Sequence, residues 1–391
     1  MKSSKKSILA KKILKTDPIL MFSIFLIVAI GLVTIYDSTY YQSVVVFEKS
    51  PLSTFKKSFL YAMFGLGSMI VFSLIDYKLL VKKRFQQIWM FALFLMALLP
   101  FFGIGKGGDA KRWLPFFGIG NFMPSEIVKF AFILGMSVFI LKYKESILDK
   151  KEFQTKKLWA FFAFIMLALI LYGKDFSTTA LLIVFVLCML FIANIRLRGL
   201  FIISGVLAVF GSAYLFLIPK IFKSQAYRIG RLDVYLKTIF DKEFIYSDSR
   251  NQILNSIYAV SNGGITGQGV GNSVFKYDIL PEASTDFIFA IFAETYGLLG
   301  SFLLLFLYGF IIYRIFKIAM VCKDPLGVYL AAGVGIFISL QVIVNIGVVL
   351  AVIPVTGIPL PFISVGGTSL IVMLSLVGIV LNIYSSNLQR R

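Results

Sequence analysis

Long apolar stretches without a charged residue constrain this chain more than any other feature of its sequence. Residues 21–35, 59–75, 88–104 and 299–312 contain no Asp, Glu, Lys or Arg. Each approaches the ~20 apolar residues that a helix needs to cross ~30 Å of hydrocarbon. Overall, 59% of the residues are hydrophobic and 15% are charged. The chain is therefore predicted to be a membrane protein, which excludes a soluble enzyme, a disordered tail and a secreted disulfide scaffold.

The pattern predicts an all-α polytopic membrane protein with about ten transmembrane helices. Their expected ranges are 18–36, 58–76, 86–104, 125–142, 158–173, 176–194, 199–219, 286–313, 327–350 and 360–383. An even number of helices puts both termini on one side, and we expect that side to be the cytoplasm. The predicted organisation is a basic cytoplasmic arm, one transmembrane domain and a cytoplasmic tail, at residues 1–17, 18–384 and 385–391.

The net charge of +20 comes from 39 Lys and Arg residues against 19 Asp and Glu residues. In a soluble protein it would suggest nucleic-acid binding. Here more than half of the basic residues fall in the N-terminal arm, the C-terminal tail and the alternate short loops that the topology assigns to the cytoplasm. This is the positive-inside pattern of membrane proteins, so no nucleic acid is expected as a partner.

The chain contains no histidine. That absence removes Ser-His-Asp and Cys-His nucleophile systems, HExxH zinc sites and imidazole proton relays. Any proton transfer must use a carboxylate, Lys, Tyr or Cys. The two cysteines, Cys188 and Cys322, lie at different predicted depths and form no CxxC pair, so no disulfide is expected.

On this topology the non-cytoplasmic face holds a loop at 103–124, a large loop at 220–285 between the seventh and eighth helices, and a Pro-rich turn at 354–361. We expect function to reside on this face. The glycine run at 263–271 inside the large loop is predicted to be flexible.

The large loop also contains an amphipathic pattern before the glycine run. Its spacing predicts a helix lying on the membrane surface. The expected apolar face consists of Ile253, Leu254, Ile257 and Tyr258, and the expected polar face of Asn251, Gln252, Asn255 and Ser256.

Two groups of charges lie close to the predicted start of the fourth helix. Glu126 and Lys129 are three residues apart and share a helix face. One interpretation is a structural ion pair inside the bundle. The other is a functional site, because burying ionisable groups at membrane depth is costly and such groups usually serve a function. Lys111 and Arg112 lie in the outer loop, against the positive-inside bias. They either bind an anionic group such as a lipid phosphate or form a solvated surface.

Two further candidate positions flank other predicted outer segments. Asp175 lies at the predicted start of the sixth helix. Its carboxylate either stabilises the helix N-terminus through the helix dipole or has a functional role. Arg228 and Arg231 share a face if their stretch is helical. They form either a clamp on a diphosphate or a solvated basic face.

Three carboxylates, Asp278, Glu282 and Asp286, lie within nine residues before the eighth helix. Asp286 directly precedes the apolar run, and an ordinary N-cap is the alternative reading of it. Because histidine is absent, this cluster is the best candidate for a general base or for a divalent metal ion such as Mg²⁺, with Asp286 and Asp278 as candidate ligands. No organic cofactor is expected.

Four separated motifs cover most of the chain. They read Asn-Phe-Met-Pro-Ser-Glu-Ile-Val-Lys at 121–129, Gly-Gln-Gly-Val-Gly-Asn-Ser-Val at 267–274, Leu-Pro-Glu-Ala-Ser-Thr-Asp-Phe-Ile-Phe-Ala at 280–290 and Pro-Leu-Pro-Phe-Ile-Ser-Val-Gly-Gly-Thr-Ser at 359–369. In this order and on this topology they strongly resemble the SEDS family of peptidoglycan polymerases. The chain is more similar to the cell-division branch of that family than to its elongation branch.

The resemblance implies a processive glycosyltransferase that joins lipid II disaccharide units into glycan strands outside the bacterial cytoplasmic membrane and releases undecaprenyl diphosphate. It also implies a class B penicillin-binding protein transpeptidase as partner, other divisome membrane proteins, and a location at the division septum. The family's essential aspartate falls on Asp286 and its outer-loop basic position on Arg112. Its fourth-helix pair falls on Glu126 and Lys129.

The resemblance assigns the acidic residue before Leu-Pro-Glu to Asp278 and places Ser364 among the candidate substrate-binding residues. The chain departs from the family pattern in two places. Ser284 stands where the family usually has His, and residues 174–178 read Lys-Asp-Phe-Ser-Thr where the family usually has Pro-Asp-Phe-Gly-Thr, so Lys174 and Ser177 differ.

The expected reaction is attack by the 4-hydroxyl of an acceptor sugar on the anomeric carbon of a lipid-linked donor, with Asp286 taking the proton. Basic residues, Arg112, Lys129, Arg228 or Arg231, would stabilise the leaving diphosphate, with or without Mg²⁺. A lipid II flippase or transporter, an elongation polymerase and a structural division scaffold remain alternatives.

Overall fold

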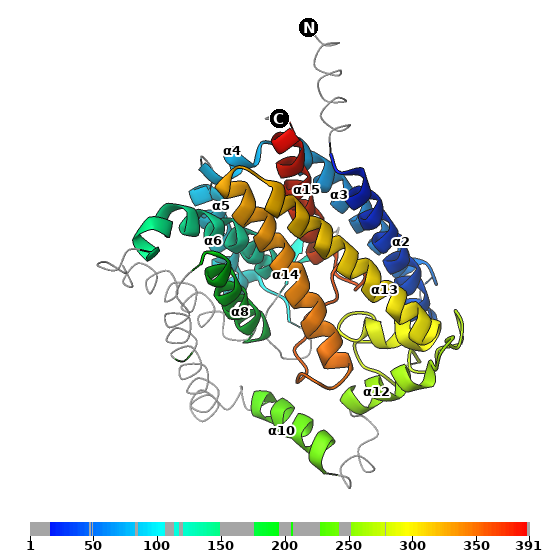
Figure 1. Ribbon diagram of the computed structural model, residues 1–391. Coiled ribbons are helices and arrows are strands. Elements are labelled where there is room, and N and C mark those ends of the chain that lie inside the picture. The colour runs from blue at the N-terminus through cyan, green and yellow to red at the C-terminus, as the bar shows by residue number, and fades with distance from the viewer. Residues whose placement is uncertain are drawn as a thin grey trace.

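The computed structural model describes residues 16–46, 48, 50–82, 85–105, 113–116, 120–148, 176–194, 205, 227–241, 252–277 and 279–388 (Figure 1). This part of the chain is predominantly helical. The predicted helices at 158–173 and 199–219 lie almost entirely outside the described residues. The helices that the structure describes are α2 (Pro18–Tyr41), the π-helical turn η1 (Gln42–Val46), α3 (Ser53–Leu74), α4 (Tyr77–Lys82), α5 (Phe85–Phe102), α6 (Pro124–Leu148), α8 (Phe176–Ile192), α10 (Tyr227–Phe240), α12 (Gln252–Asn262), α13 (Ile288–Val321), α14 (Pro325–Val349) and α15 (Gly367–Leu388).

Six helical segments in the described residues are long and apolar enough to cross a membrane. They belong to α2 with η1, α3, α6, α13, α14 and α15. The helices α5 and α8 contain shorter apolar stretches. The chain is therefore a multi-pass membrane protein, as the sequence predicts.

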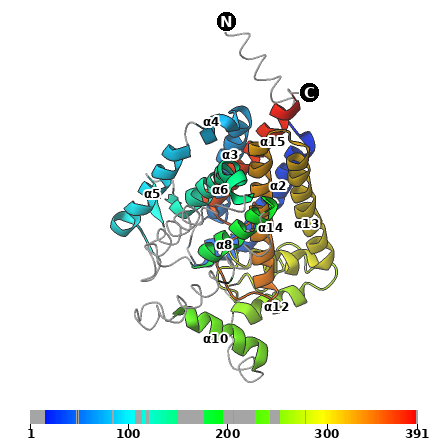
Figure 2. The same cartoon turned by 60° about the vertical axis from the view of Figure 1, so that its left-hand side comes forward.

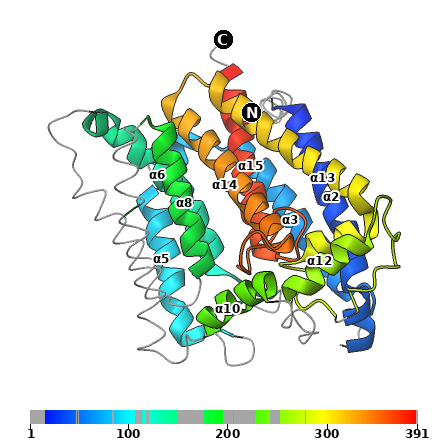
Figure 3. The ribbon, with the colours of Figure 1, turned by 60° about the horizontal axis from the view of Figure 1, so that its bottom comes forward.

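The helices form a bundle in which α14 and α15 lie between the group α5, α6 and α8 on one side and the pair α2 and α13 on the other (Figure 3). α2 begins and α15 ends at the same end of this bundle. α12 lies at the opposite end, beside the start of α13 and the end of α14 (Figure 1). We refer to this opposite end as the α12 end. α10 lies at the same end, next to α12 (Figure 2 and Figure 3).

Small residues allow α15 to pack closely along α3. A Cβ atom added to Gly378 would lie 2.4 Å from the carbonyl oxygen of Met69, and one added to Gly65 would lie 2.5 Å from a methyl group of Leu374. Close helix approach through small residues is typical of membrane bundles, where packing replaces the hydrophobic effect.

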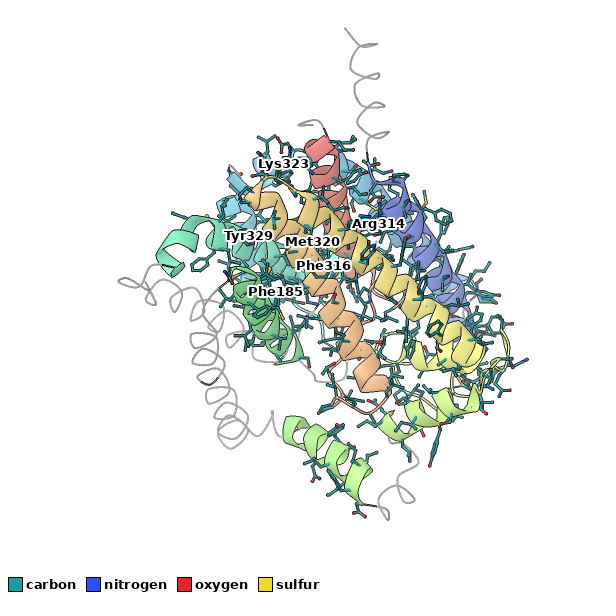
Figure 4. The ribbon with its side chains drawn as sticks, in the orientation of Figure 1. Phe185, Arg314, Phe316, Met320, Lys323 and Tyr329 are labelled. Atoms are coloured by element: carbon teal, nitrogen blue, oxygen red, sulfur yellow. The ribbon has the colours of Figure 1, made fainter. Side chains whose placement is uncertain are left out.

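The start of α2 is fixed by a buried carboxylate. The side chain of Asp17 accepts hydrogen bonds from the backbone N–H groups of Ile19 and Leu20, both at 3.1 Å, so it caps the helix that Pro18 begins. The same carboxylate forms an ion pair with Arg314 of α13 (Figure 4). The cap therefore also joins α2 to α13.

The predicted eighth helix, 286–313, differs from its prediction. α13 starts at Ile288, extends to Val321 and is broken at Gly297, whose φ is +65°. The glycine run packs against the break. Its backbone accepts hydrogen bonds from the N–H groups of Leu298 and Leu299, while Gln268 and Gly269 donate to the carbonyls of Glu294 and Thr295. Backbone groups that the break frees are thus paired inside the protein, as a membrane interior requires.

The glycine run is consequently packed at Gly263 and Gly267, where the predicted flexible loop is wrong, while residues 264–266 and 268–271 are exposed. Gly267 has a φ of +84°, and a Cβ atom there would lie 2.2 Å from the carbonyl oxygen of Thr295. A Cβ atom at Gly263 would lie 2.1 Å from the carbonyl oxygen of Ala293. Only glycine lets the two backbones approach this closely.

Glu294 and Asp37 attach the segment after α12 to the bundle. Glu294 is fully buried and accepts hydrogen bonds from Asn262, from the hydroxyl of Ser273 and from the N–H of Val274. Asp37 of α2 forms a buried ion pair with Lys276 at 2.7 Å. Asp37 also accepts hydrogen bonds from the N–H of Gly271 and the hydroxyl of Thr295.

α12 confirms the predicted helix but not its predicted faces. Asn255 and Ser256 are buried, whereas Tyr258 is exposed. The Asn255 amide donates to the carbonyl oxygen of Ile279, and the Ser256 hydroxyl donates to that of Val349 at the end of α14. The polar residues point inward because they bind backbone carbonyls that no helix or sheet pairs.

Two other predictions also need correction. The outer loop contains a β-hairpin, β1 (Leu114–Phe116) paired antiparallel with β2 (Gly120–Phe122), so the chain is not entirely α-helical. The predicted tenth helix, 360–383, begins only at Gly367. Pro361 and the positive φ of Phe362, +69°, keep the preceding residues out of the helix.

The packing at Gly267 predicts a stability difference between two glycine substitutions. Gly271→Ala carries only the strain of a positive φ, about 1–2 kcal/mol, because no atom lies within 4 Å of its added Cβ. Gly267→Ala adds a steric clash worth about 1–3 kcal/mol more. Thermal unfolding of the purified variants should therefore give the lower midpoint for Gly267→Ala. Equal midpoints would show that this close approach is not needed.

Candidate functional site

Asp286 lies in a turn, residues 281–287, directly before α13. The carbonyl oxygen of Glu282 accepts hydrogen bonds from the N–H groups of Thr285, Asp286 and Phe287. The residue at the N-cap of α13 is Phe287, and no side chain caps the helix. The interpretation of Asp286 as an ordinary N-cap is therefore wrong. The extra turn shifts the helix start past the aspartate.

The carboxylate of Asp286 faces the Pro-rich turn. Its Oδ2 lies 3.4 Å from the position that a Cβ atom on Gly357 would occupy. Gly357 has a φ of +74°, so glycine serves here both the backbone conformation and the close approach. Asp286 is half-buried between these two segments.

Two side chains hold the turn of Asp286 against the segment 358–366. Asn345 of α14 donates from its amide to the carbonyl oxygens of Asp286 and Ile358, both at 2.8 Å. The hydroxyl of Ser364 donates to the carbonyl oxygen of Thr285 at 2.6 Å and accepts from the N–H of Leu360. Ser364, predicted to bind substrate, is thus engaged in positioning the turn that carries Asp286.

The segment 358–366 passes deep into the bundle. The hydroxyl of Tyr308 donates to the carbonyl oxygen of Pro361, and a Cβ atom added to Gly31 would lie 2.6 Å from the carbonyl oxygen of Phe362. Gly31 is 13 residues beyond Pro18, about 20 Å along α2 at ~1.5 Å per residue. The segment 358–366 therefore enters the bundle as a non-helical stretch, where the sequence predicts the end of an outer turn, 354–361, and the start of a helix at residue 360.

Glu126 and Lys129 form the predicted ion pair at the start of α6. Lys129 Nζ lies 2.7 Å from Glu126 Oε1, and both side chains are buried. The second oxygen of Glu126, Oε2, and the hydroxyl of Ser125 are buried and have no hydrogen-bond partner in the described part of the chain. Because Glu126 already neutralises Lys129, this lysine is a poor candidate for binding a diphosphate.

Hydrogen bonds connect the motifs. The N–H of Met123 donates to the hydroxyl of Thr368, which joins the first motif to the last. The N–H of Val365 donates to the carbonyl oxygen of Ser284, which joins the last motif to the third. Three of the four motifs thus converge near Asp286, while the second packs against the break in α13.

Four other predicted site residues, Lys111, Arg112, Asp175 and Asp278, lie outside the described residues.

Arg228 and Arg231 lie three residues apart in α10, so the condition that their stretch is helical is met. α10 contacts the Pro-rich turn region through a hydrogen bond from Tyr235 to the carbonyl oxygen of Val352. In the same helix Lys237 pairs with Asp233 at 2.8 Å, and this hydrogen bond raises the pKa of the lysine. Charge on α10 is thus partly balanced.

Glu282 is exposed and accepts a hydrogen bond from the hydroxyl of Thr285 at 3.0 Å. Among the residues that the structure describes, no three His, Cys, Asp or Glu side chains come together as a metal site. The predicted ligand pair of Asp286 and Asp278 includes one residue outside that set, so metal binding stays a prediction.

Sequence reasoning missed the polar residues of α14. Gln341 and Asn345 are buried inside an apolar helix, and both Gln341 amide atoms and Asn345 Oδ1 have no hydrogen-bond partner within the described ranges. Two amides four residues apart in a membrane segment were the available signal, because such groups are costly in hydrocarbon unless they are paired.

The comparisons with known proteins agree with the four motifs. The family model for the FtsW, RodA and SpoVE group, described as cell cycle protein, matches residues 18–389. The chain is 33% identical over 392 residues to a Bacillus subtilis protein named probable peptidoglycan glycosyltransferase FtsW, covering 97% of this chain and 95% of the relative. It is 33% identical over 372 residues to stage V sporulation protein E of the same organism, covering 94% and 97%.

Two solved structures share the fold. One is a chain from a study of how a peptidoglycan synthase complex coordinates polymerization and crosslinking, with a TM-score of 0.72, 23% identity, and 96% and 99% of the two chains covered. The other is the rod shape determining protein RodA of Thermus thermophilus, with a TM-score of 0.65, 22% identity, and 95% and 97% covered. On its sequence motifs, its family match and its curated relatives, the chain belongs to the FtsW, RodA and SpoVE family of cell cycle proteins.

Proposed function

We propose that this protein is a peptidoglycan glycosyltransferase that polymerises lipid II into glycan strands at the outer face of the bacterial cytoplasmic membrane. The observation that carries the proposal is the placement of Asp286. Its backbone is held by Asn345 and its carboxylate faces Gly357, so it is not used as a helix cap. The curated relatives named peptidoglycan glycosyltransferase support the same activity.

The proposed topology has ten transmembrane helices, both termini in the cytoplasm, and the large loop between the seventh and eighth helices outside. The α12 end would then face outward. The common position of the start of α2 and the end of α15 supports this arrangement. The Lys and Arg bias of the sequence supports it independently.

In the proposed reaction the 4-hydroxyl oxygen of the acceptor sugar bonds to the anomeric carbon of the lipid-linked donor. The bond from that carbon to the diphosphate oxygen breaks, and undecaprenyl diphosphate leaves with the electron pair. Asp286 takes the hydroxyl proton as general base, a contribution of typically 10²–10⁴-fold. Lys129 is neutralised by Glu126. The negative charge of the leaving diphosphate is therefore stabilised by Lys111, Arg112, Arg228 or Arg231.

A divalent cation such as Mg²⁺ is proposed as a second means of stabilising the leaving diphosphate. Hard cations prefer carboxylate oxygen ligands, and Asp286 and Asp278 are the candidates. Asp175 remains a further candidate for contacting the substrate.

The proposed partner is a class B penicillin-binding protein that crosslinks the strands, together with other divisome membrane proteins at the septum. A structural neighbour described in a peptidoglycan synthase complex supports such a pairing, and relatives named FtsW support division over elongation. A lipid II flippase is the rival. The break in α13 gives it little support, because the glycine run pairs the freed backbone groups and fills that position.

Replacing the carboxylate of Asp286 by an amide tests the proposed base. Asp286→Asn should lower polymerisation of purified lipid II at least about 100-fold, measured with the protein reconstituted beside its transpeptidase. The control Asp233→Asn changes an exposed carboxylate of α10 that pairs with Lys237 and should keep wild-type activity. Equal activity of Asp286→Asn and the wild type would exclude Asp286 as the base. Polymer from neither, with lipid II movement across vesicles intact, would favour the flippase.

Removal of divalent cations tests the metal. Chelation should abolish polymerisation, and added Mg²⁺ should restore it, because the diphosphate would otherwise leave without that charge compensation. The measurement is strand synthesis by the wild type at fixed ionic strength across a Mg²⁺ titration. Full activity in excess chelator would exclude a metal from the reaction.

A further inference from the structure

Four buried polar atoms close to the start of α6 and the middle of α14 are without partners in the described structure. They are Ser125 Oγ, Glu126 Oε2, and Oε1 and Nε2 of Gln341. Gln341 is fully buried, at 0% exposure. Buried polar groups in native proteins nearly always have a partner, since leaving them unpaired costs stability. Such atoms mark a place where a polar group of a bound ligand can find hydrogen-bond partners.

The helix register brings these atoms to one level. Gly333 of α14 packs against Ile133 of α6 and Met189 of α8, with the added Cβ 3.4–3.5 Å from their side chains. α6 and α8 run opposite to α14. Gln341, eight residues beyond Gly333, therefore lies at the level of Ser125, eight residues before Ile133, because all helices rise equally per residue.

An aromatic layer lies directly beneath this level. The rings of Phe132 and Phe337 each lie 5.8 Å from that of Phe185, which Figure 4 labels on α8, so the layer joins α6, α8 and α14. Gln341 is one turn beyond Phe337 toward the α12 end. The polar atoms of Ser125, Glu126 and Gln341, which we call the Gln341 layer, thus lie about one helical turn beyond an apolar layer, which we call its apolar floor.

The Gln341 layer lies next to the candidate site. Asn345, one turn beyond Gln341 on the same face of α14, donates to the carbonyl oxygen of Asp286. The rise between Asn345 and Gln341 is about 6 Å along the helix, comparable to the width of one sugar ring. A sugar whose reacting atom is beside Asp286 could therefore place a ring substituent in the Gln341 layer.

The chemistry of the layer selects an uncharged ligand. Lys129 is already paired with Glu126, and the unpartnered Glu126 Oε2 is an acceptor that repels anions. The remaining atoms offer N–H and O–H donors together with carbonyl and carboxylate acceptors. An amide supplies the complementary carbonyl and N–H, and the aromatic floor suits a methyl group. A hydroxyl would leave that apolar floor unused.

We propose that the Gln341 layer binds the acetamido group of a lipid-linked N-acetylated sugar and makes Gln341 a specificity-determining residue. This inference rests on the proposed function. The amide of Gln341 pairs with the acetamido group, Ser125 and Glu126 complete its hydrogen bonds, and its methyl group packs against Phe337. The acetamido group can come from either sugar of the disaccharide, and substrate analogues distinguish the two.

The test measures kcat/KM for polymerisation with the protein reconstituted beside its transpeptidase. The substrates are lipid II and two analogues, each with a hydroxyl in place of the acetamido group on one of the two sugars. The wild type should discriminate against one analogue by about tenfold or more. Gln341→Met should lower kcat/KM on lipid II by a similar factor and lose most of the discrimination. Ser339→Ala, on the same helix with its hydroxyl bound to the Gly335 carbonyl, should behave as the wild type.

Several results would overturn the proposal. One is a wild type that accepts both analogues as well as lipid II, and another is a Gln341→Met variant that discriminates as strongly as the wild type. A third is a Gln341→Met variant that melts well below the wild type, because Gln341 would then pair within the protein. In contrast, a wild type that forms no polymer from lipid II would refute the proposed function itself.

Discussion

Every backbone polar group inside a membrane bundle needs a hydrogen-bond partner from the protein. The arrangement of the non-helical segments in this structure depends on that constraint. Three non-helical segments pack against or into the bundle: the largely exposed glycine run at 263–271, the turn at 281–287 and the buried segment 358–366. Each finds its partners on another segment, as when Leu298 and Leu299 donate to the glycine run. Segments far apart in the sequence are therefore fastened together at the positions where the motifs occur.

Buried charged side chains are subject to the same requirement for a partner. The buried ions of the described residues are paired or hydrogen-bonded: Asp17 with Arg314, Asp37 with Lys276, and Glu126 with Lys129, while Glu294 accepts from four donors. Unpaired ions would cost several kcal/mol each at this depth. The described interior consequently suits uncharged groups, and a diphosphate must be met by basic residues of the outer segments.

The sequence predicted features that depend on local pattern. The apolar stretches gave eight of the ten expected helices a counterpart, and the i, i+3 spacing of Glu126 and Lys129 predicted their ion pair. The sequence pattern did not predict features that depend on which other segment of the chain packs against a helix. The break at Gly297 and the inward orientation of Asn255 are set by neighbours remote in sequence. Helical periodicity carries no information about such partners.

The way Asp286 is held separates its position from its chemistry. Asn345 binds the carbonyl oxygen of Asp286, and Glu282 accepts its N–H, so the backbone is fixed by contacts that do not involve the carboxylate. A general base must stay within hydrogen-bond reach of the proton it removes. Here that geometry is provided by the junction of two segments whose hydrogen bonds to Asn345 and Glu282 hold the backbone of the turn. A residue positioned in this way is suited to repeated proton transfer during processive synthesis.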